Sequence, residues 1–241
     1  MRIGILDVGF DNVTLDEAVS AARGFLAEGG SHCVVTPNPE IVYMCRTDRA
    51  LAEAVNGADL VLPDGIGIVY ASRILGRPLK GKTAGIDFAV RLTAVLAEEG
   101  RSLFLLGAKP GIAERAAEAL RTANPGLIIA GTADGYFKDD GPVVARINES
   151  GAQAVFVCLG APKQELWMRK NRNALQASLL VGLGGSLDVF AGEASRAPEF
   201  MIRLGLEWFY RLLKEPRRIG RMAKLPLFLL AVIAGGRGND R

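Results

Sequence analysis

Polar and glycine-containing strings follow directly after several apolar runs, at positions where side chains could do chemistry. They are TPNPE at 36–40, PDG at 63–65, LGAPKQELW at 159–167 and GGSLDVFAG at 184–192. Each string precedes or opens a helical pattern, so each is expected to join the end of a strand to the start of a helix. In an open α/β sheet, ligands bind outside the carboxyl ends of the strands. The four strings therefore predict a ligand site built from several loops.

Asp64 is the clearest candidate for acid–base chemistry. It follows the apolar run ADLVLP and stands before the helical segment IGIVYASRIL. A carboxylate that faces a ligand site can act as a general base, which typically contributes roughly 10²–10⁴-fold in rate. A carboxylate before a helix can equally cap the exposed N–H groups of the first turn. The local sequence leaves both interpretations open.

Thr36 and Asn38 lie in a loop before a helix that opens with Pro39 and Glu40. A threonine hydroxyl, an asparagine amide and the N–H groups of a helix start can together hold a polar ligand. The alternative is that Asn38 only caps the helix. Either interpretation fits the residue types.

Lys163 and Gln164 are expected in the first turn of a helix opened by Pro162, just after Gly160. Because helix N-termini attract negative charge, this turn suits a diphosphate or sugar hydroxyls. The alternative is an ordinary helix start in which Trp167 packs into the core.

Two glycine-rich turns, LLGAKPG at 105–111 and GLGGSLDVFAG at 182–192, also follow apolar runs. Either could cradle a nucleotide with its backbone N–H groups. Neither has the spacing of a dinucleotide fingerprint or of a P-loop. Tight packing turns are the alternative interpretation.

The sequence offers little for metal, cofactor or nucleophile chemistry. His32 is the only histidine, no DxD motif occurs, and Asp139-Asp140 stands in the turn-like string FKDDGP. The three cysteines are scattered in apolar surroundings, which indicates no disulfide framework and a reducing cytoplasm. We therefore expect neither a metal nor a cofactor.

The elements that must position these residues alternate between strand and helix. Apolar runs predict strands at 2–6, 33–36, 59–62, 102–106, 127–131, 154–159 and 179–183, and periodicity predicts helices at 14–28, 39–56, 65–75, 86–99, 110–122, 141–149 and 162–173. This βαβ spacing, with continuous apolar strands, predicts a Rossmann-like α/β fold: a mostly parallel sheet with helices on both faces. We expect residues 1–195 to form this core.

The segment 196–241 differs in character and is expected to be a helical appendage. It has ten Lys/Arg against four Asp/Glu, a net charge of +6, whereas the whole chain carries +3. The string FMIRLGLEWFYRLLKEP predicts one amphipathic helix, with Arg203, Glu207 and Arg211 spaced for ion pairs. The uncharged stretch 225–236 is shorter than the about 20 residues that span a bilayer, so it could only lie on a membrane surface.

Taken together, the strings resemble the WecG/TagA/CpsF family of bacterial glycosyltransferases (family 26). The resemblance covers most of the chain and is carried by TPNPE, PDGIG, GIDF at 85–88, FLLGAKPG, DGYF at 134–137, LGAPKQELW, GLGGSLDVFAG, RAPE and GLEWFYRLLKEPRR. It favours the functional interpretations over a helix cap for Asp64 and over an ordinary helix start for Gln164.

The resemblance implies an inverting transfer from a UDP-sugar to a polyprenyl-diphosphate-linked N-acetylglucosamine. Members of the family add N-acetylmannosamine for wall teichoic acid, N-acetylmannosaminuronate for enterobacterial common antigen, or glucose for exopolysaccharides. The lipid acceptor implies a cytoplasmic protein that is peripheral at the inner face of the cell membrane. Such a displacement needs a base on the acceptor hydroxyl and stabilisation of the leaving diphosphate.

Carried onto this sequence, the resemblance makes Asp64 the base, with Thr36 and Gln164 as further catalytic residues. The substrate-binding residues that it implies are Asn38, Lys82, Gly85, Asp87, Gly107, Lys109, Tyr136, Lys163, Gly184, Gly185, Arg217, Arg218 and Arg221. The backbone at 107–111 and 184–185 would take the nucleotide. Lys82 stands where family members commonly have arginine, so it would supply charge to a diphosphate without a bidentate fork.

The basic C-terminal residues gain a role from the same resemblance. Arg217, Arg218, Arg221 and Lys224 would reach a diphosphate or lipid head groups, each contributing roughly 1 kcal/mol near an anionic surface. The apolar stretch 225–233 would insert shallowly into the membrane. The same stretch could instead bury against a partner chain, which predicts a homo-oligomer.

Two rival hypotheses come from other classes of protein. An NAD-type or non-catalytic nucleotide-binding protein would carry a glycine fingerprint with an acidic residue about 20 positions later. The first strand leads instead into DVGFDN. A nucleic-acid-binding module over 203–224 would place stacking aromatics among its basic residues. Trp208, Phe209 and Tyr210 lie instead on an otherwise apolar helix, so we expect no nucleic acid partner.

Overall fold

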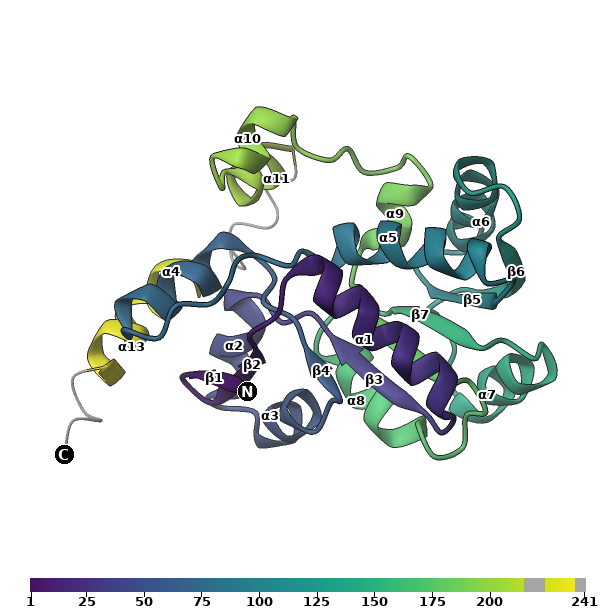
Figure 1. Ribbon diagram of the computed structural model, residues 1–241, viewed down its shortest axis with the longest axis horizontal. Coiled ribbons are helices and arrows are strands. Elements are labelled where there is room, and N and C mark those ends of the chain that lie inside the picture. The colour runs from purple at the N-terminus through teal and green to yellow at the C-terminus, as the bar shows by residue number, and fades with distance from the viewer. Residues whose placement is uncertain (215–223, 237–241) are drawn as a thin grey trace.

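A six-stranded parallel sheet forms the centre of the computed structural model, which describes residues 1–214 and 224–236 (Figure 1). From one edge to the other its strands are β4 (Leu60–Val61), β3 (His32–Val35), β8 (Leu179–Gly182), β7 (Ala154–Cys158), β5 (Ser102–Gly107) and β6 (Ile128–Ala133). Every neighbouring pair is parallel. The predicted Rossmann-like α/β class is confirmed.

Helices cover both faces because successive strand residues send their side chains into two separate apolar clusters. Leu105 and Phe156 belong to one cluster, and Phe104 and Val155 to the other. The first cluster is completed by α1 (Leu15–Glu28), α5 (Gly85–Glu98), α6 (Ile112–Ala123) and α9 (Ser186–Phe190). The second is completed by α2 (Pro39–Cys45), α3 (Arg49–Asn56), α4 (Ile66–Ile74), α7 (Asp140–Glu149) and α8 (Lys163–Asn171).

The first predicted strand does not join this sheet, which corrects the sequence-based expectation. β1 (Arg2–Ile5) pairs antiparallel with β2 (Val8–Asp11), a strand that the sequence analysis missed. The Asp11 carboxylate accepts the Val61 N–H at 2.9 Å, so a side chain ties this hairpin to β4. In the turn between the strands Leu6 has a φ of 53°, a conformation that leucine seldom adopts and that hydrophobic periodicity does not signal.

The predicted helix over 39–56 is in fact two helices, α2 and α3. Helix α2 ends at Cys45. Helix α3 begins after its N-cap residue Asp48, whose side chain accepts the Leu51 N–H at 2.9 Å. An aspartate in the N-cap position fixes the start of α3, because it satisfies a backbone donor of the first turn.

The prediction of a single amphipathic helix after Pro198 is wrong. α10 (Glu199–Arg203) ends before Gly205, which has a φ of 73°, and α11 (Glu207–Lys214) begins after it. Arg203 pairs with Glu199 at 2.5 Å instead of with Glu207. Figure 1 shows α10 and α11 set apart from the sheet, joined to α9 by an extended linker. The break at Gly205 leaves Glu207 able to reach Lys82 in the core.

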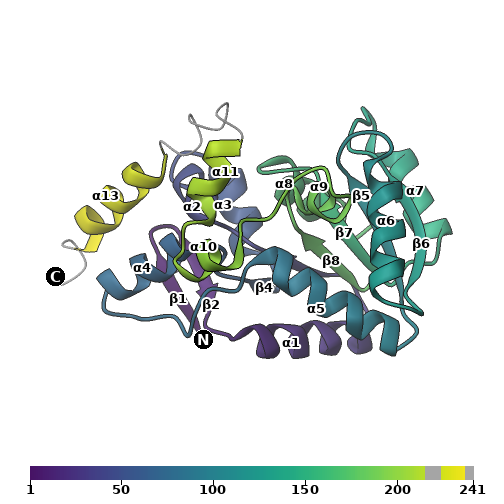
Figure 2. The same cartoon turned by 90° about the horizontal axis from the view of Figure 1, so that it is seen from above.

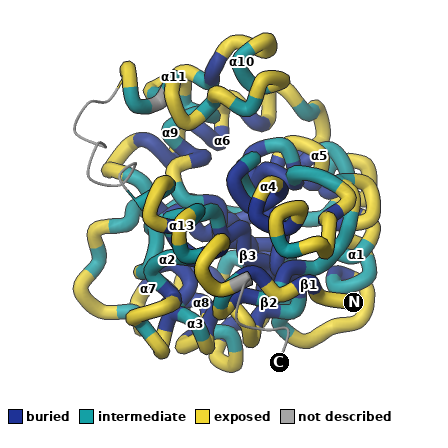
Figure 3. Tube along the Cα trace, turned by 90° about the vertical axis from the view of Figure 1, so that its left-hand side faces the viewer, coloured by how far each residue is buried: buried dark blue, intermediate teal, exposed yellow. Residues whose placement is uncertain are grey.

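The last described helix, α13 (Lys224–Gly236), packs against α2 and α4 (Figure 2). Phe228 and Val232 are fully buried in the core, whereas Leu227, Leu230 and Ile233 are exposed. Figure 3 shows both buried and exposed stretches along this helix where it lies over α2. In the part of the chain that the structure describes, no helix is long and apolar enough to cross a membrane.

Candidate active site

A small pocket lies at the carboxyl edge of the sheet, where the chain leaves β4 and β8. It has a volume of about 50 Å³ and is lined by Asp64, Ala84, Gly85, Ile86, Leu183, Gly185, Ser186, Val189 and Glu207. These residues come from two strand-end loops, the start of α5, the short helix α9 and α11. Because a drug-sized ligand needs about 300–1,000 Å³, this pocket fits reacting groups better than a whole nucleotide sugar.

Asp64 enters this pocket from the end of β4. Its backbone N–H contacts the Pro37 carbonyl at 3.4 Å, which joins the PDG loop to the TPNPE loop. Helix α4 begins at Ile66 with Gly65 in the N-cap position, so Asp64 lies one residue before the cap. Asp64 is partly buried and lines the pocket together with the start of α5. A carboxylate in this place has access to a ligand, as general-base chemistry requires.

Thr36 is buried beside the pocket and connects its walls. Its hydroxyl donates to the Gly182 carbonyl at 2.9 Å, which links the end of β3 to the end of β8. A Cβ at Gly85 would lie 3.0 Å from Thr36 Oγ1, so α5 approaches this closely because its first residue is glycine. The structure therefore brings Thr36 and Gly85 together at the pocket.

Asn38 is the N-cap of α2. Its Oδ1 accepts the Ile41 N–H at 3.1 Å, and Pro39 follows in the first turn. The capping interpretation of Asn38 is therefore confirmed. Because Oδ1 is engaged in this way, the amide nitrogen Nδ2 is the atom with which Asn38 could contact a ligand.

Gln164 lies beneath the loop that follows β8. Its Oε1 accepts the Gly184 N–H at 2.9 Å, and its Nε2 donates to Glu165 Oε1 at 2.8 Å. Gln164 and Glu165 are each only 2% exposed. Gly182 leaves room for the amide, since a Cβ there would lie 3.2 Å from Nε2. In this arrangement the Gln164 side chain shapes the loop at Gly184.

A second group of predicted residues gathers at the ends of β5, β6 and β7. Gly107 has a φ of 132°, and a Cβ there would lie 2.3 Å from the Cys158 carbonyl oxygen, so only glycine fits. Lys163 Nζ donates to the Gly135 carbonyl at 2.8 Å, which joins α8 to the loop after β6. The exposed side chains of this group are those of Lys109, Tyr136 and Lys163. This edge combines exposed lysines with an exposed aromatic ring.

Several helices that start near this edge lack side-chain caps. The N-cap residues of α4, α5, α6, α8 and α9 supply no capping bond from a side chain; they are Gly65, Ala84, Gly111, Pro162 and Gly185. By contrast, α1 starts with a capping box of Thr14 and Glu17. Backbone N–H groups at a helix start that have no such partner attract anions. The carboxyl edge is therefore suited to a negatively charged ligand.

Comparison with known proteins assigns the chain to a family. The profile of the glycosyl transferase WecG/TagA/CpsF family matches residues 3–241. The chain belongs to this family. The resemblance inferred from the sequence is thereby confirmed, and with it the class of enzyme, a glycosyltransferase.

Similar proteins from two genera carry the same name, N-acetylglucosaminyldiphosphoundecaprenol N-acetyl-beta-D-mannosaminyltransferase. The protein from Bacillus spizizenii (strain ATCC 23059 / NRRL B-14472 / W23) is 38% identical over 217 residues, which cover 90% of this chain and 84% of that protein. The protein from Staphylococcus aureus (strain MW2) is 36% identical over 239 residues, which cover 98% and 94%. The similarity thus extends through the C-terminal segment.

Two ion pairs join the C-terminal segment of this glycosyltransferase to the start of α5. Lys82 Nζ lies 3.4 Å from Glu207 Oε2, and Arg196 Nη2 lies 2.6 Å from Asp87 Oδ1. The sequence predicted Lys82 and Asp87 as site residues but missed Glu207 and Arg196. The available signal was the presence of both missed residues in the family strings RAPE and GLEWFYRLLKEPRR.

Burial controls the ionisation of several groups at or below the site. Desolvation raises the pKa of Glu165, outweighing the hydrogen bond from Gln164, which lowers it. Burial raises the pKa of Cys33 to about 11 and the pKa of Cys45 and of Cys158 to about 12. These three free thiols are protonated and unreactive near neutral pH. Among the described residues, no group of three or more His, Cys, Asp or Glu side chains could hold a metal ion.

Three predicted substrate-binding residues, Arg217, Arg218 and Arg221, lie outside the described residues. Lys224, which the sequence analysis grouped with them, begins α13. Its Nζ lies 3.7 Å from Glu40 Oε1, in the first turn of α2. The C-terminal segment therefore contacts the core at the helix that Asn38 caps.

Proposed function

We propose that this glycosyltransferase transfers N-acetylmannosamine from a UDP-sugar to N-acetylglucosaminyl-diphosphoundecaprenol, with inversion at the anomeric carbon. The observation that carries the proposal is the position of Asp64, in a pocket shared with the uncapped start of α5 and with the loop after β8. The names of the Bacillus and Staphylococcus relatives support this sugar and this acceptor. Wall teichoic acid synthesis is the process that such a product would serve.

Asp64 would act as the general base. Its carboxylate takes the proton from a hydroxyl of the acceptor sugar while that oxygen attacks the anomeric carbon of the donor. The bond from this carbon to the UDP oxygen breaks on the opposite side, and UDP leaves with the electron pair. Removing such a base typically costs roughly 10²–10⁴-fold in rate.

The charge that develops on the leaving diphosphate would be met by Lys82, by the first N–H groups of α5 from Gly85 onward and by the backbone at Gly184–Gly185. The start of α5 lines the pocket, as does Glu207, the ion-pair partner of Lys82. The ion pair between Asp87 and Arg196 holds the same end of α5. Donors arranged in advance around a leaving group lower the barrier because they need no reorganisation.

The rest of the donor would extend along the carboxyl edge toward β5 and β6. The backbone over 107–111 and the exposed side chains of Lys109, Tyr136 and Lys163 are suited to a nucleotide. Thr36 and Gln164 would hold the pocket walls, and Asn38 would offer its Nδ2 atom to a sugar.

We also propose that residues 196–241 form an appendage that holds the enzyme at the inner face of the cytoplasmic membrane. The exposed Leu227, Leu230 and Ile233 of α13 support this, as do Phe200 of α10 and Leu204, which follows that helix. Apolar side chains beside basic residues favour binding to an anionic surface. A homo-oligomer that covers the same side chains is the alternative, and sedimentation with and without vesicles distinguishes the two.

The test of the proposed reaction uses purified full-length protein, a short-chain polyprenyl-diphosphate-N-acetylglucosamine and a panel of UDP-sugars, with products read by mass. We expect one sugar to be added from UDP-N-acetylmannosamine, and more slowly or not at all from UDP-glucose or UDP-N-acetylmannosaminuronate. We propose that no metal is required, so EDTA should leave the rate unchanged. If product formed only from another donor, the proposed donor sugar would be wrong. Loss of activity in EDTA that Mg²⁺ restores would overturn the metal-free mechanism.

A further inference from the structure

Glu165 is a carboxyl group buried directly beneath the pocket loop. It is the third residue of α8, and only one of its oxygens, Oε1, has a hydrogen-bond partner within residues 1–214 and 224–236. Burial of a polar group without full pairing costs free energy compared with an apolar side chain. A residue that is unfavourable for stability at its position calls for another reason to be there.

The two hydrogen bonds of Gln164 allow its amide only one orientation. The Gly184 N–H can only donate, so the amide oxygen of Gln164 must face it. Glu165 Oε1 accepts, so the amide nitrogen must face Glu165. A flipped amide would place two donors against each other at Gly184 and two acceptors against each other at Glu165. The Gly184 N–H and the acceptor oxygen of Glu165 therefore together decide which end of the Gln164 side chain meets the loop.

The loop that Gln164 holds is a wall of the Asp64 pocket. Thr36 fixes the Gly182 carbonyl from one side, and Gln164 fixes the Gly184 N–H from the other. Gly185, the next residue, lines the pocket. Two hydrogen bonds, from Gln164 to Glu165 and from Gly184 to Gln164, thus connect the buried carboxyl group to the loop whose next residue lines the pocket.

We propose that Glu165 is a positioning residue of the transfer reaction: through the side-chain amide of Gln164 it sets the Gly184–Gly185 wall of the Asp64 pocket. The proposal rests on the proposed function, in which this wall meets the donor diphosphate. Glu165 touches no substrate and acts only through Gln164. Its acceptor oxygen, and not its charge, is the property that the loop requires.

The test compares Glu165→Gln, which keeps an acceptor oxygen, with Glu165→Leu, which removes it. The readout that does not depend on activity is hydrogen exchange of the Gly184 amide. We expect faster exchange in Glu165→Leu and wild-type exchange in Glu165→Gln. In the transferase assay Glu165→Leu should lose roughly 10²-fold in kcat/KM, the scale of a misplaced reacting centre, and Glu165→Gln should stay within about threefold of wild type.

Two further variants separate positioning from folding. Trp167→Phe changes another buried side chain of α8 and should alter neither readout. Gln164→Leu should reproduce the faster exchange at Gly184 even if Glu165→Leu fails to fold, and adding Glu165→Leu to it should cause no further loss.

Unchanged exchange at Gly184 in a folded Glu165→Leu, or equal losses in the Leu and Gln variants, would overturn the proposal. If no donor gives product with the wild type, the proposed reaction is wrong. The exchange measurement still decides whether Glu165 sets the loop at Gly184, so the two failures are distinguishable.

Discussion

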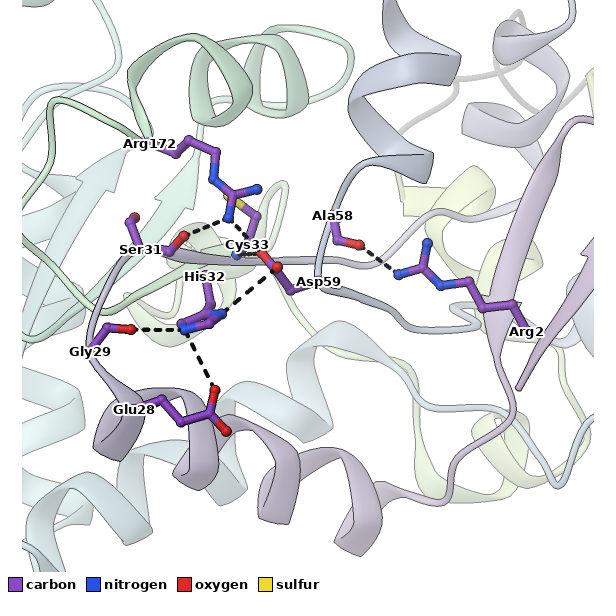
Figure 4. A network of polar contacts seen from close by, with 9 residues as sticks. All are labelled: Arg2, Glu28, Gly29, Ser31, His32, Cys33, Ala58, Asp59 and Arg172. Atoms are coloured by element: carbon purple, nitrogen blue, oxygen red, sulfur yellow. Dashed lines mark hydrogen bonds and ion pairs between the residues drawn. The ribbon is translucent and has the colours of Figure 1, made fainter.

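The two ends of the parallel sheet are built differently, although the same strands form both. At the amino end, the Asp59 carboxylate accepts the Cys33 N–H at 2.8 Å and lies 3.1 Å from the Arg172 guanidinium (Figure 4). His32 Nδ1 lies 3.8 Å from the same carboxylate, and Arg172 donates to the Ser31 carbonyl at 2.7 Å. Opposite charges and backbone groups here satisfy one another.

At the carboxyl end, hydrogen-bond donors and acceptors remain available to a ligand. The starts of α4, α5, α6 and α8 have no side-chain cap, and Glu165 has one oxygen without a partner in the described residues. The contrast teaches that this chain places stabilising contacts at one edge and binding capacity at the other, as expected of an open parallel sheet. Substitutions at the two edges should therefore separate stability from activity.

Asp64→Asn should give the largest effect on activity. We expect kcat to fall roughly 10²–10⁴-fold, because the amide cannot take the acceptor proton, while the midpoint of thermal unfolding changes little. Steady-state kinetics and calorimetry on the same preparation check both. If Asp64→Asn kept near wild-type kcat, Asp64 would be a structural residue of the loop before α4, and the comparison would break.

Asp59→Ala should give the opposite result. Removal of the acceptor leaves the Cys33 N–H and the Arg172 guanidinium short of a partner, so we expect the free energy of unfolding to drop by about 1–2 kcal/mol. The kcat of the folded fraction should not change. Urea denaturation followed by fluorescence measures the first quantity. A large loss of kcat without loss of stability would show that the amino end also serves the reaction.

Lys82→Met should cost less than Asp64→Asn. A charged hydrogen-bond donor to the diphosphate would be lost, which corresponds to roughly a tenfold fall in kcat/KM for the donor. Lys82→Arg restores the charge and should recover most of this loss. Glu207→Gln is the matched control, since it removes the negative partner of Lys82 and keeps the lysine. Equal activity of Lys82→Met and wild type would exclude Lys82 from leaving-group stabilisation.

The smallest effect concerns the pH dependence of stability. Because the pKa of Glu165 is raised by burial above its ordinary value of 4.5, the folded protein keeps a proton that the unfolded chain releases. The free energy of unfolding of the wild type should therefore fall as pH rises from 4.5 toward the raised pKa. Glu165→Gln lacks this titration, so its stability relative to wild type should improve as the pH rises above 4.5 toward the raised pKa. A pH-independent difference would mean that Glu165 titrates alike in both states.

The parallel sheet and the polar loops at its carboxyl end could be predicted from the sequence, because they depend on local patterns, whereas the contacts at the amino end could not. Continuous apolar runs indicated the buried parallel strands, and polar strings after them indicated Asp64 and Gln164. Glu165 was missed because an acidic residue in the first turn of a helix is ordinary, and only the packing of α8 shows that it is buried. The pairing of Lys82 with Glu207 joins residues 125 positions apart, which no local pattern can reveal.

The position of α13 has a consequence for how the chain folds during synthesis. Helices α2 and α4 are made early, yet they bury Phe228 and Val232 only when α13 has been made. A domain generally folds as a unit, and apolar surface that is exposed before it is complete favours aggregation. Until residues 224–236 have been made, the helix that Asn38 caps lacks its contact with α13. A ribosome that stops before Lys224 would release a chain with an unfinished core as well as a shortened tail.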